Sequence, residues 1–296
     1  MTTSKSTSTA IYLLFFTSSL LFSVAHAQQS SITEADGSSC MGDEQSRKQT
    51  ENSALQDAKR LAIEFTSTYL ESETVIENFQ LKNDLVQAFA KANVQVIDIL
   101  SKSWDDPRDC FTIRIRAEVL PNPAQMQKIN SSQMMANPRA PLNVELWTNE
   151  DSFISGESIK IYLRGNKPFY ARLLYIDAAD NNVQLLPNLH RTKNYFAGAT
   201  IFEVPNAEDD FELTVGGPFG KEKLILYAST SPLGEIATTK ANDDVYFVTE
   251  KPEHIAAKTR GISITKPGSG SGQQKKTVAE FAEVSVEVVT REDTTE

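Results

Sequence analysis

Cysteine and histidine are scarce in this chain of 296 residues, which holds two Cys and three His. Cys40 and Cys110 form no Cys-x-x-Cys redox motif, and their spacing from His190 and His254 does not match that of zinc ligands. The sequence also lacks the motifs of serine hydrolases, zinc proteases, phosphate-binding loops and dinucleotide sites. It therefore predicts no catalytic residue, no metal ligand and no cofactor.

Long hydrophobic runs are absent except for Ile11–Ala25, which Thr17, Ser18 and Ser19 interrupt. A membrane span needs about 20 apolar residues, and this stretch is shorter. With Lys5 before it and Ala25-His26-Ala27 at its end, it has the organisation of a secretory signal peptide. We expect Met1–Ala27 to be cleaved and the protein to be periplasmic or secreted in a Gram-negative bacterium. No transmembrane segment is expected after cleavage.

Basic residues are too few to balance the acidic ones, 29 against 39, so the formal net charge is −10. Removal of Met1–Ala27 takes away Lys5 and no acid, which leaves a charge of −11. An acidic protein repels phosphate backbones, so nucleic acid is not expected as a partner. Adjacent acids such as Asp105-Asp106 fall in predicted turns and lack the alternating spacing of calcium ligands.

The two cysteines are expected to pair with each other. An isolated pair in an oxidising compartment is most simply a disulfide. A bond between Cys40 and Cys110 closes a loop of about 70 residues, and loop-closure entropy assigns it about 4 kcal/mol.

The first folded part is expected at residues 46–120, after a flexible lead-in at 28–45 that is small and polar. Apolar residues at three- and four-residue intervals predict a helix over Asn52–Tyr69. Strict alternation in Phe111–Val119 predicts a strand with one buried face. Helices on a short antiparallel sheet make this a small α+β domain.

The second folded part is expected at residues 142–290. Short β-branched segments separated by Gly, Asn and Pro turns predict an all-β, sandwich-like domain, which ends with the alternating strand Thr277–Val289. Residues 121–141 hold four prolines among Gln, Asn and Ser, which predicts a linker. Residues 291–296 are a polar tail. We expect the two parts to fold independently.

The second part carries a series of short motifs: Val144-Glu145-Leu146-Trp147-Thr148, Gly156-Glu157, Leu185-Leu186-Pro187-Asn188, Phe202-Glu203-Val204-Pro205 and Gly217-Pro218-Phe219-Gly220. In order and spacing they resemble the bacterial domain-of-unknown-function family numbered 4384, over residues 141–235. The resemblance implies a β-rich envelope domain without a known activity, and it supplies no catalytic residues.

The first part resembles the N-terminal domain of the flagellar assembly protein T and of related envelope lipoproteins. This resemblance rests on the helix Asn52–Tyr69 followed by the strand Phe111–Val119. It is a likeness of architecture more than of sequence motifs. A flagellar role does not follow from it.

A glycine-rich loop is the candidate binding segment, made of Gly216, Gly217, Pro218, Phe219 and Gly220. Its glycines and proline permit unusual backbone angles and the close approach of another chain. Phe219 is either an exposed aromatic anchor for a partner or a plug in the end of the sandwich. The plug is the preferred interpretation.

Two function hypotheses follow. The first is an exported, non-catalytic binding or assembly module of the bacterial cell envelope, whose partner is an unknown envelope protein or glycan. The alternative is an enzyme or accessory subunit acting on envelope polymers, either peptidoglycan or peptide. The alternative requires a pocket where carboxylates or a histidine such as His190 converge. The missing motifs favour the first hypothesis.

Overall fold

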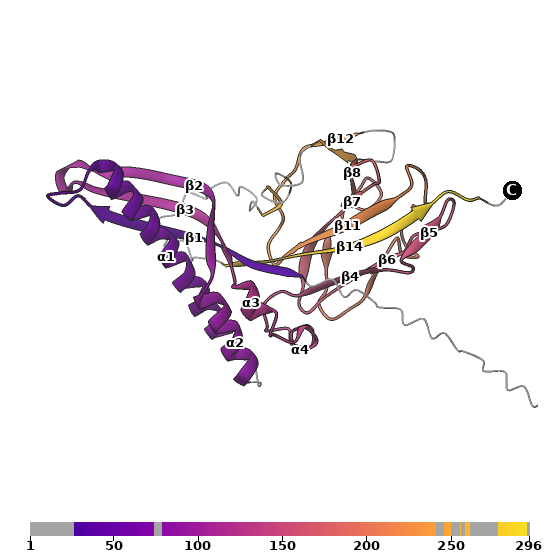
Figure 1. Ribbon diagram of the computed structural model, residues 1–296, viewed down its shortest axis with the longest axis horizontal. Coiled ribbons are helices and arrows are strands. Elements are labelled where there is room, and N and C mark those ends of the chain that lie inside the picture. Colours follow the sequence, from indigo (N-terminus) through magenta and orange to yellow (C-terminus); the bar gives the residue numbers. More distant parts are fainter. Residues whose placement is uncertain are drawn as a thin grey trace, which may run out of the picture.

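The computed structural model describes residues 27–73, 79–240, 246–249, 255, 258–260 and 278–294. In these residues the chain forms a mixed α+β fold with a large curled half-barrel sheet, a small three-stranded sheet and four α-helices (Figure 1). The expected signal peptide up to residue 26 lies outside the described residues, and so does His254.

The helices are α1 (Arg47–Glu73), α2 (Phe79–Ala90), α3 (Pro123–Met126) and α4 (Ser131–Met135), with a 3-10 turn at Asp106–Arg108. The small sheet contains β4 (Val144–Thr148), β6 (Ile161–Gly165) and β10 (Phe202–Val204). The large sheet contains β1 (Gln28–Cys40), β2 (Asn93–Asp105), β3 (Cys110–Leu120), β5 (Ser152–Ile154), β7 (Phe169–Ile176), β8 (Asn182–Leu186), β9 (Tyr195–Phe196), β11 (Lys221–Ser229), β12 (Thr238–Lys240), β13 (Tyr246–Val248) and β14 (Ala279–Arg291).

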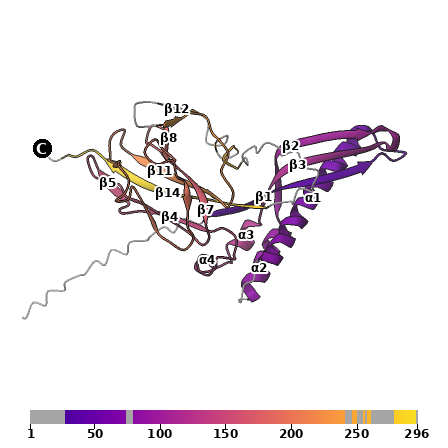
Figure 2. The ribbon, with the colours of Figure 1, turned by 180° about the vertical axis from the view of Figure 1, so that it is seen from behind.

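One sheet runs through the whole molecule, in the strand order β12-β13-β8-β7-β11-β14-β1-β3-β2. All its pairs are antiparallel except β5 with β14. We call residues 28–120 the N-terminal half, 121–141 the junction segment and 142–294 the C-terminal half. The long strands β1 and β14 lie side by side and connect the two halves (Figures 1 and 2). Independent folding of the halves stays a prediction.

The expectation of a flexible lead-in at 28–45 is wrong, because most of this segment is β1, a central strand of the sheet. Its buried residues include Ser30, Ser31 and Thr33, so no apolar alternation marks the strand in the sequence. Gly37 allows α1 to pack directly on the strand. A Cβ atom at Gly37 would lie 2.2 Å from the carbonyl oxygen of Ala54.

Helix α1 covers one face of the N-terminal half (Figure 1). The side chains of Ala54, Ala58 and Ala62 are fully buried, and they share a core with Ile115 and Val119 of β3. The predicted helix and the predicted alternating strand are both confirmed, although α1 extends further at both ends. Small residues on the buried face of α1 bring the helix close to the sheet.

The predicted disulfide is confirmed: Cys40 and Cys110 are bonded to each other. They are register partners at the end of β1 and the start of β3, so the bond links two neighbouring strands. The disulfide therefore holds the end of the strand that the sequence did not predict.

Substitution of Cys110→Ser is expected to lower the free energy of unfolding by about 2–4 kcal/mol, because the unfolded chain loses a long closed loop. Urea denaturation under non-reducing conditions measures this. The double variant with Cys40→Ser as well is the control, and it should match the single variant because the same bond is lost. Two free thiols in the wild-type protein isolated under non-reducing conditions, found by mass spectrometry, would contradict the pairing.

The junction segment is not an extended linker, because it forms α3 and α4 and contributes buried side chains to a core. The side-chain oxygens of Asn122 and Asn130 cap the two helices by accepting a backbone N–H in the first turn. Both views place these helices between α2 and β4 (Figures 1 and 2). The buried cluster comprises Leu81, Leu85, Ile129, Met134 and Ala140.

The core of the C-terminal half lies between the small sheet and the large sheet. The C-terminal half resembles the expected all-β sandwich in having a core between two sheets. It differs from a separate sandwich domain, because the large sheet curls and continues into the N-terminal half. In β14, Ala282, Val284 and Val288 are buried in this core, which confirms the predicted final strand. Its place between β11 and β1 makes β14 the link between the halves.

Removal of β14 is expected to destroy the large sheet, because a chain ending at Lys266 leaves β11 and β1 without their shared neighbour. We expect this chain to be insoluble or to lose cooperative thermal unfolding, as measured by circular dichroism. A chain ending at Arg291 keeps β14 and is expected to behave like the full-length protein. Equal solubility and equal Tm for the chain ending at Lys266 would refute the central role of β14.

Candidate binding pocket

A pocket of about 800 Å³ lies where the N-terminal half, the junction segment and the start of the C-terminal half meet. We call it the junction pocket. Its walls come from the beginning of β1, the end of β3, the helices α3 and α4, and the beginning of β4. Figure 1 shows these elements near the middle of the molecule, where the N-terminal and C-terminal halves adjoin. The sequence did not predict this pocket.

Apolar side chains from four elements and their flanks line the junction pocket. Helices α3 and α4 contribute methionines, whose flexible thioether side chains adapt to ligands of different shapes. Met134 also belongs to the buried cluster with α2, so its position is fixed from behind. The apolar members of the lining include Leu120, Met126, Ile129, Met134 and Val144.

Carboxamide groups dominate the polar lining, and Gln29 and Asn143 are the buried ones among them. Gln29 Nε2 donates to the carbonyl oxygen of Leu142 at 3.1 Å and to Asn143 Oδ1 at 3.2 Å. Gln29 Oε1 is buried and has no hydrogen-bond partner. The carboxamides are those of Gln28, Gln29, Asn93, Asn122, Gln127 and Asn143.

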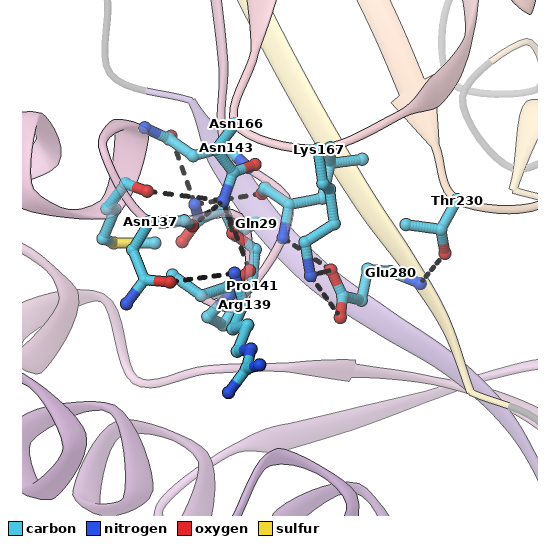
Figure 3. Close-up of polar contacts among 12 residues, drawn as sticks. Gln29, Asn137, Arg139, Pro141, Asn143, Asn166, Lys167, Thr230 and Glu280 are labelled. Atoms are coloured by element: carbon cyan, nitrogen blue, oxygen red, sulfur yellow. Dashed lines mark hydrogen bonds and ion pairs between the residues drawn. The ribbon is translucent and has the colours of Figure 1, made fainter. Parts of the chain in front are cut away.

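Asn166, in the turn between β6 and β7, holds the junction segment in place (Figure 3). Its Nδ2 group lies within hydrogen-bond distance of four backbone carbonyl oxygens between residues 134 and 141, the shortest being that of Asn137 at 3.0 Å. Its Oδ1 accepts the N–H of Asn143 at 2.8 Å. This buried side chain therefore fixes the backbone behind the pocket.

The buried carboxylate of Glu280 connects the two halves. Its oxygens accept from Lys167 Nζ at 3.0 and 2.8 Å (Figure 3). They also accept from Leu142 N at 2.7 Å and from Tyr69 Oη at 3.3 Å. The side chain of Glu280 is 4 % exposed and that of Lys167 is 15 % exposed, so the ion pair is shielded from water. Leu142 links this carboxylate to Gln29 in the pocket wall.

Substitution of Glu280→Gln is expected to lower the free energy of unfolding by about 3 kcal/mol, because it leaves the buried Lys167 without its carboxylate. Urea denaturation measures this. Glu287→Gln, at an exposed site on the same strand, should change stability by less than about 0.5 kcal/mol. Adding Lys167→Met to Glu280→Gln should recover part of the loss. Equal effects at Glu280 and Glu287 would refute the role of Glu280.

Two further buried carboxylates stabilise the large sheet and do not line the pocket. Glu118 accepts from Ser30 Oγ at 2.6 Å and lies 2.7 Å from Arg260 Nε. Glu222 accepts from Thr290 Oγ1 at 2.8 Å and from the Tyr175 hydroxyl. Burial raises the pKa of the Tyr175 phenol, and its hydrogen bond to Glu222 raises that pKa further. Each carboxylate is held by neighbouring donors, and this arrangement is typical of side chains that stabilise a fold.

The glycine-rich loop lies at the other end of β14 from the junction pocket. Its backbone is tied to that strand, since Gly220 N donates to Thr290 Oγ1 at 3.1 Å and Thr290 N donates to Gly220 O at 2.9 Å. Phe219 is half-buried and packs against the core of the C-terminal half. This geometry favours the plug interpretation. A binding role for Gly216–Gly220 stays a prediction.

A second cavity of about 700 Å³ lies between β5 and the residues that follow β14. Acidic side chains line it, among them Glu157, which accepts the N–H of Ile154 at 2.7 Å. His190, the one histidine in the described ranges, is not part of its lining. His190 Nδ1 instead lies 3.3 Å from the exposed Asp210. The carboxylates of this cavity and the histidine are therefore not brought together.

Metal ions and membranes have no identified site here. Across the described ranges, no group of three or more His, Cys, Asp or Glu side chains is placed to hold a metal ion. No helix in the same ranges combines the length and apolar character needed to cross a membrane.

Comparison with known proteins identifies one region. Residues 152–232 match the family described as "Domain of unknown function (DUF4384)". The match is narrower than the expected range of 141–235. No curated protein and no solved structure matches the chain. Nothing supports the expected likeness of the N-terminal half to flagellar assembly protein T.

The DUF4384 domain runs from β5 to just beyond the end of β11, and it includes the glycine-rich loop. The residues that line the junction pocket all precede it, the last of them being Glu145. The pocket is therefore built by the N-terminal half, the junction segment and β4. The matched domain instead supports β14 through the pairing of that strand with β11.

Proposed function

We propose that this protein is an exported, non-catalytic binding or assembly module of the bacterial cell envelope, and that it holds its partner in the junction pocket. The observation that supports this most is the pocket itself. Apolar side chains and hydrogen-bonding side chains line it together, a combination that ligand sites use for affinity and for orientation.

The start of the expected mature chain supports the same proposal. Cleavage after Ala27 leaves Gln28, the first residue of β1, as the N-terminus, and both residues line the pocket. The processed chain therefore retains nearly the whole lining. The disulfide between Cys40 and Cys110 suits an oxidising compartment outside the cytoplasm.

The chemistry of the lining favours binding over catalysis. Among the described residues, the pocket is lined by no histidine or cysteine, and its one carboxylate is that of Glu145. Glu145 Oε2 lies 2.6 Å from Arg164 Nη2, which holds it as an ion pair. A general base with an orienting partner, or a nucleophile beside such a base, is missing from this lining.

Photocrosslinking in living cells tests the proposal. A benzophenone amino acid replaces Gln127, which is exposed and lines the pocket, or Gln133, which is exposed on α4 and does not line it. We expect the mature protein, beginning at Gln28, to form one reproducible crosslinked species from position 127 and none from position 133.

Competition makes this test specific to the pocket. Unlabelled wild-type protein should abolish the crosslink from position 127, whereas a competitor carrying Met126→Glu should not, because a charge in the apolar lining opposes binding. A competitor carrying Ile154→Glu, at an exposed apolar site outside the pocket, should act like wild type. Failure to crosslink any species, or equal competition by both variants, would reject the proposed function.

A further inference from the structure

Gln28, the first residue of β1, is exposed, whereas the two residues that follow it are buried. Gln29 is 6 % exposed and Ser30 is 4 % exposed. The backbone at the start of β1 is held in the sheet, because residues 28–30 pair with residues 283–281 of β14. Gln28 therefore stands on an ordered backbone and remains accessible from the junction pocket, which it lines.

The two consecutive glutamines differ in how their carboxamides are held. Gln29 Nε2 donates to the carbonyl oxygen of Leu142 at 3.1 Å and to Asn143 Oδ1 at 3.2 Å, so the Gln29 side chain is fixed in the pocket wall. Exposed side chains exchange rotamers within nanoseconds. The carboxamide of Gln28 can therefore fold back onto the nitrogen of its own residue, and that of Gln29 cannot do so without breaking two hydrogen bonds.

Export gives this difference a chemical meaning. Cleavage after Ala27, which the signal-peptide pattern predicts, makes Gln28 an N-terminal glutamine with a new α-amine. Attack of this amine on the side-chain carbon Cδ closes a five-membered ring. Because α-amino groups titrate close to neutral pH, a fraction of the chains carries the neutral amine that can attack. The two reacting groups lie on one residue, so their effective concentration is high.

We propose that Gln28 of the mature chain is a modification site and is converted to pyroglutamate. The bond between the α-nitrogen and Cδ forms, and the bond between Cδ and Nε2 breaks. The Nε2 group leaves as ammonia and takes one proton from the α-nitrogen, so no oxidant, reductant or second substrate is needed. This inference goes beyond the proposed function and shares with it the expected cleavage after Ala27.

The modification sets the charge of the junction pocket. An unmodified mature chain places an ammonium group at residue 28, in the same lining as the side chain of Lys91. Pyroglutamate carries a neutral lactam instead, with one N–H donor and one carbonyl acceptor, as in a peptide group. A blocked N-terminus also offers no free amine to aminopeptidases. The wall residues Gln28 and Gln29 are thereby protected from trimming.

Mass spectrometry of the exported protein tests the inference. The protein is isolated from cells with immediate acid quenching, and its N-terminal peptide is sequenced by tandem mass spectrometry. We expect this peptide to begin at residue 28 and to be lighter than the encoded peptide by one ammonia. An amine-reactive reagent should label its N-terminus only after treatment with pyroglutamate aminopeptidase. A peptide that begins at Gln28 with a free amine, or at any other residue, would overturn the inference.

Two variants test the chemistry and its structural basis. Gln28→Asn keeps a carboxamide but would have to close a four-membered ring, so its N-terminus should stay free. Deletion of Gln28 makes Gln29 the first residue. We expect this chain to release ammonia at least about tenfold more slowly when folded than when unfolded in urea, because two hydrogen bonds hold the Gln29 carboxamide in the fold.

The wild-type mature chain is the matched control for this rate. Its ammonia release should differ little between the folded and the unfolded state, because Gln28 is exposed. Both chains are freed from an N-terminal fusion by a protease that leaves the glutamine first, and ammonia is then followed over time. Equal rates for the two folded chains would overturn the structural basis of the inference.

These results are independent of the crosslinking experiment. A free amine at Gln28 together with a pocket-dependent crosslink from position 127 would overturn the modification and leave the proposed function standing. A blocked N-terminus without any crosslink would support the modification and reject the proposed function.

Discussion

The buried carboxylate of Glu280 is the interaction on which the arrangement of the two halves depends. Taking a carboxylate out of water costs several kcal/mol, and this cost is offset only where donors surround the group. Here the donors come from Tyr69 on α1, from the backbone of Leu142, and from Lys167 in the turn between β6 and β7. These three segments must take up their positions around β14 together. The buried carboxylate thus fixes the relative positions of segments that are far apart in the sequence.

The junction pocket takes its shape from the same arrangement. Leu142 donates its N–H to Glu280, and its carbonyl oxygen accepts from Gln29. A single residue therefore connects the buried carboxylate to the pocket wall. Asn166, next to Lys167, holds the backbone of the junction segment from behind. The bonds of Glu280 to Leu142 and of Asn166 to the junction segment join residues that do not line the cavity, so they form without a ligand. A wall that is already ordered lowers the entropy cost of binding.

The sequence predicted those elements whose signal is local. Alternating apolar residues revealed β3 and β14, and the isolated pair of cysteines revealed the disulfide. The strand β1 was missed because most of its buried residues are small or polar, and because Gly37 serves the packing of α1 against it. The helices α3 and α4 were missed for a different reason. Asn122-Pro123 is a helix-start signal as well as a linker signal, and only the tertiary burial of side chains such as Met134 decides between the two.

The pocket has no sequence signature, because its lining is gathered from four separate segments at 27–29, 91–93, 120–134 and 143–145. None of them lies in the matched range 152–232. The DUF4384 domain therefore acts here as a support, since its strand β11 positions β14, and β14 in turn positions the start of β1. Function resides in sites that are built onto folds. A chain with the same domain but a different N-terminal half would keep the support and lose this pocket, so the family match alone does not specify the ligand.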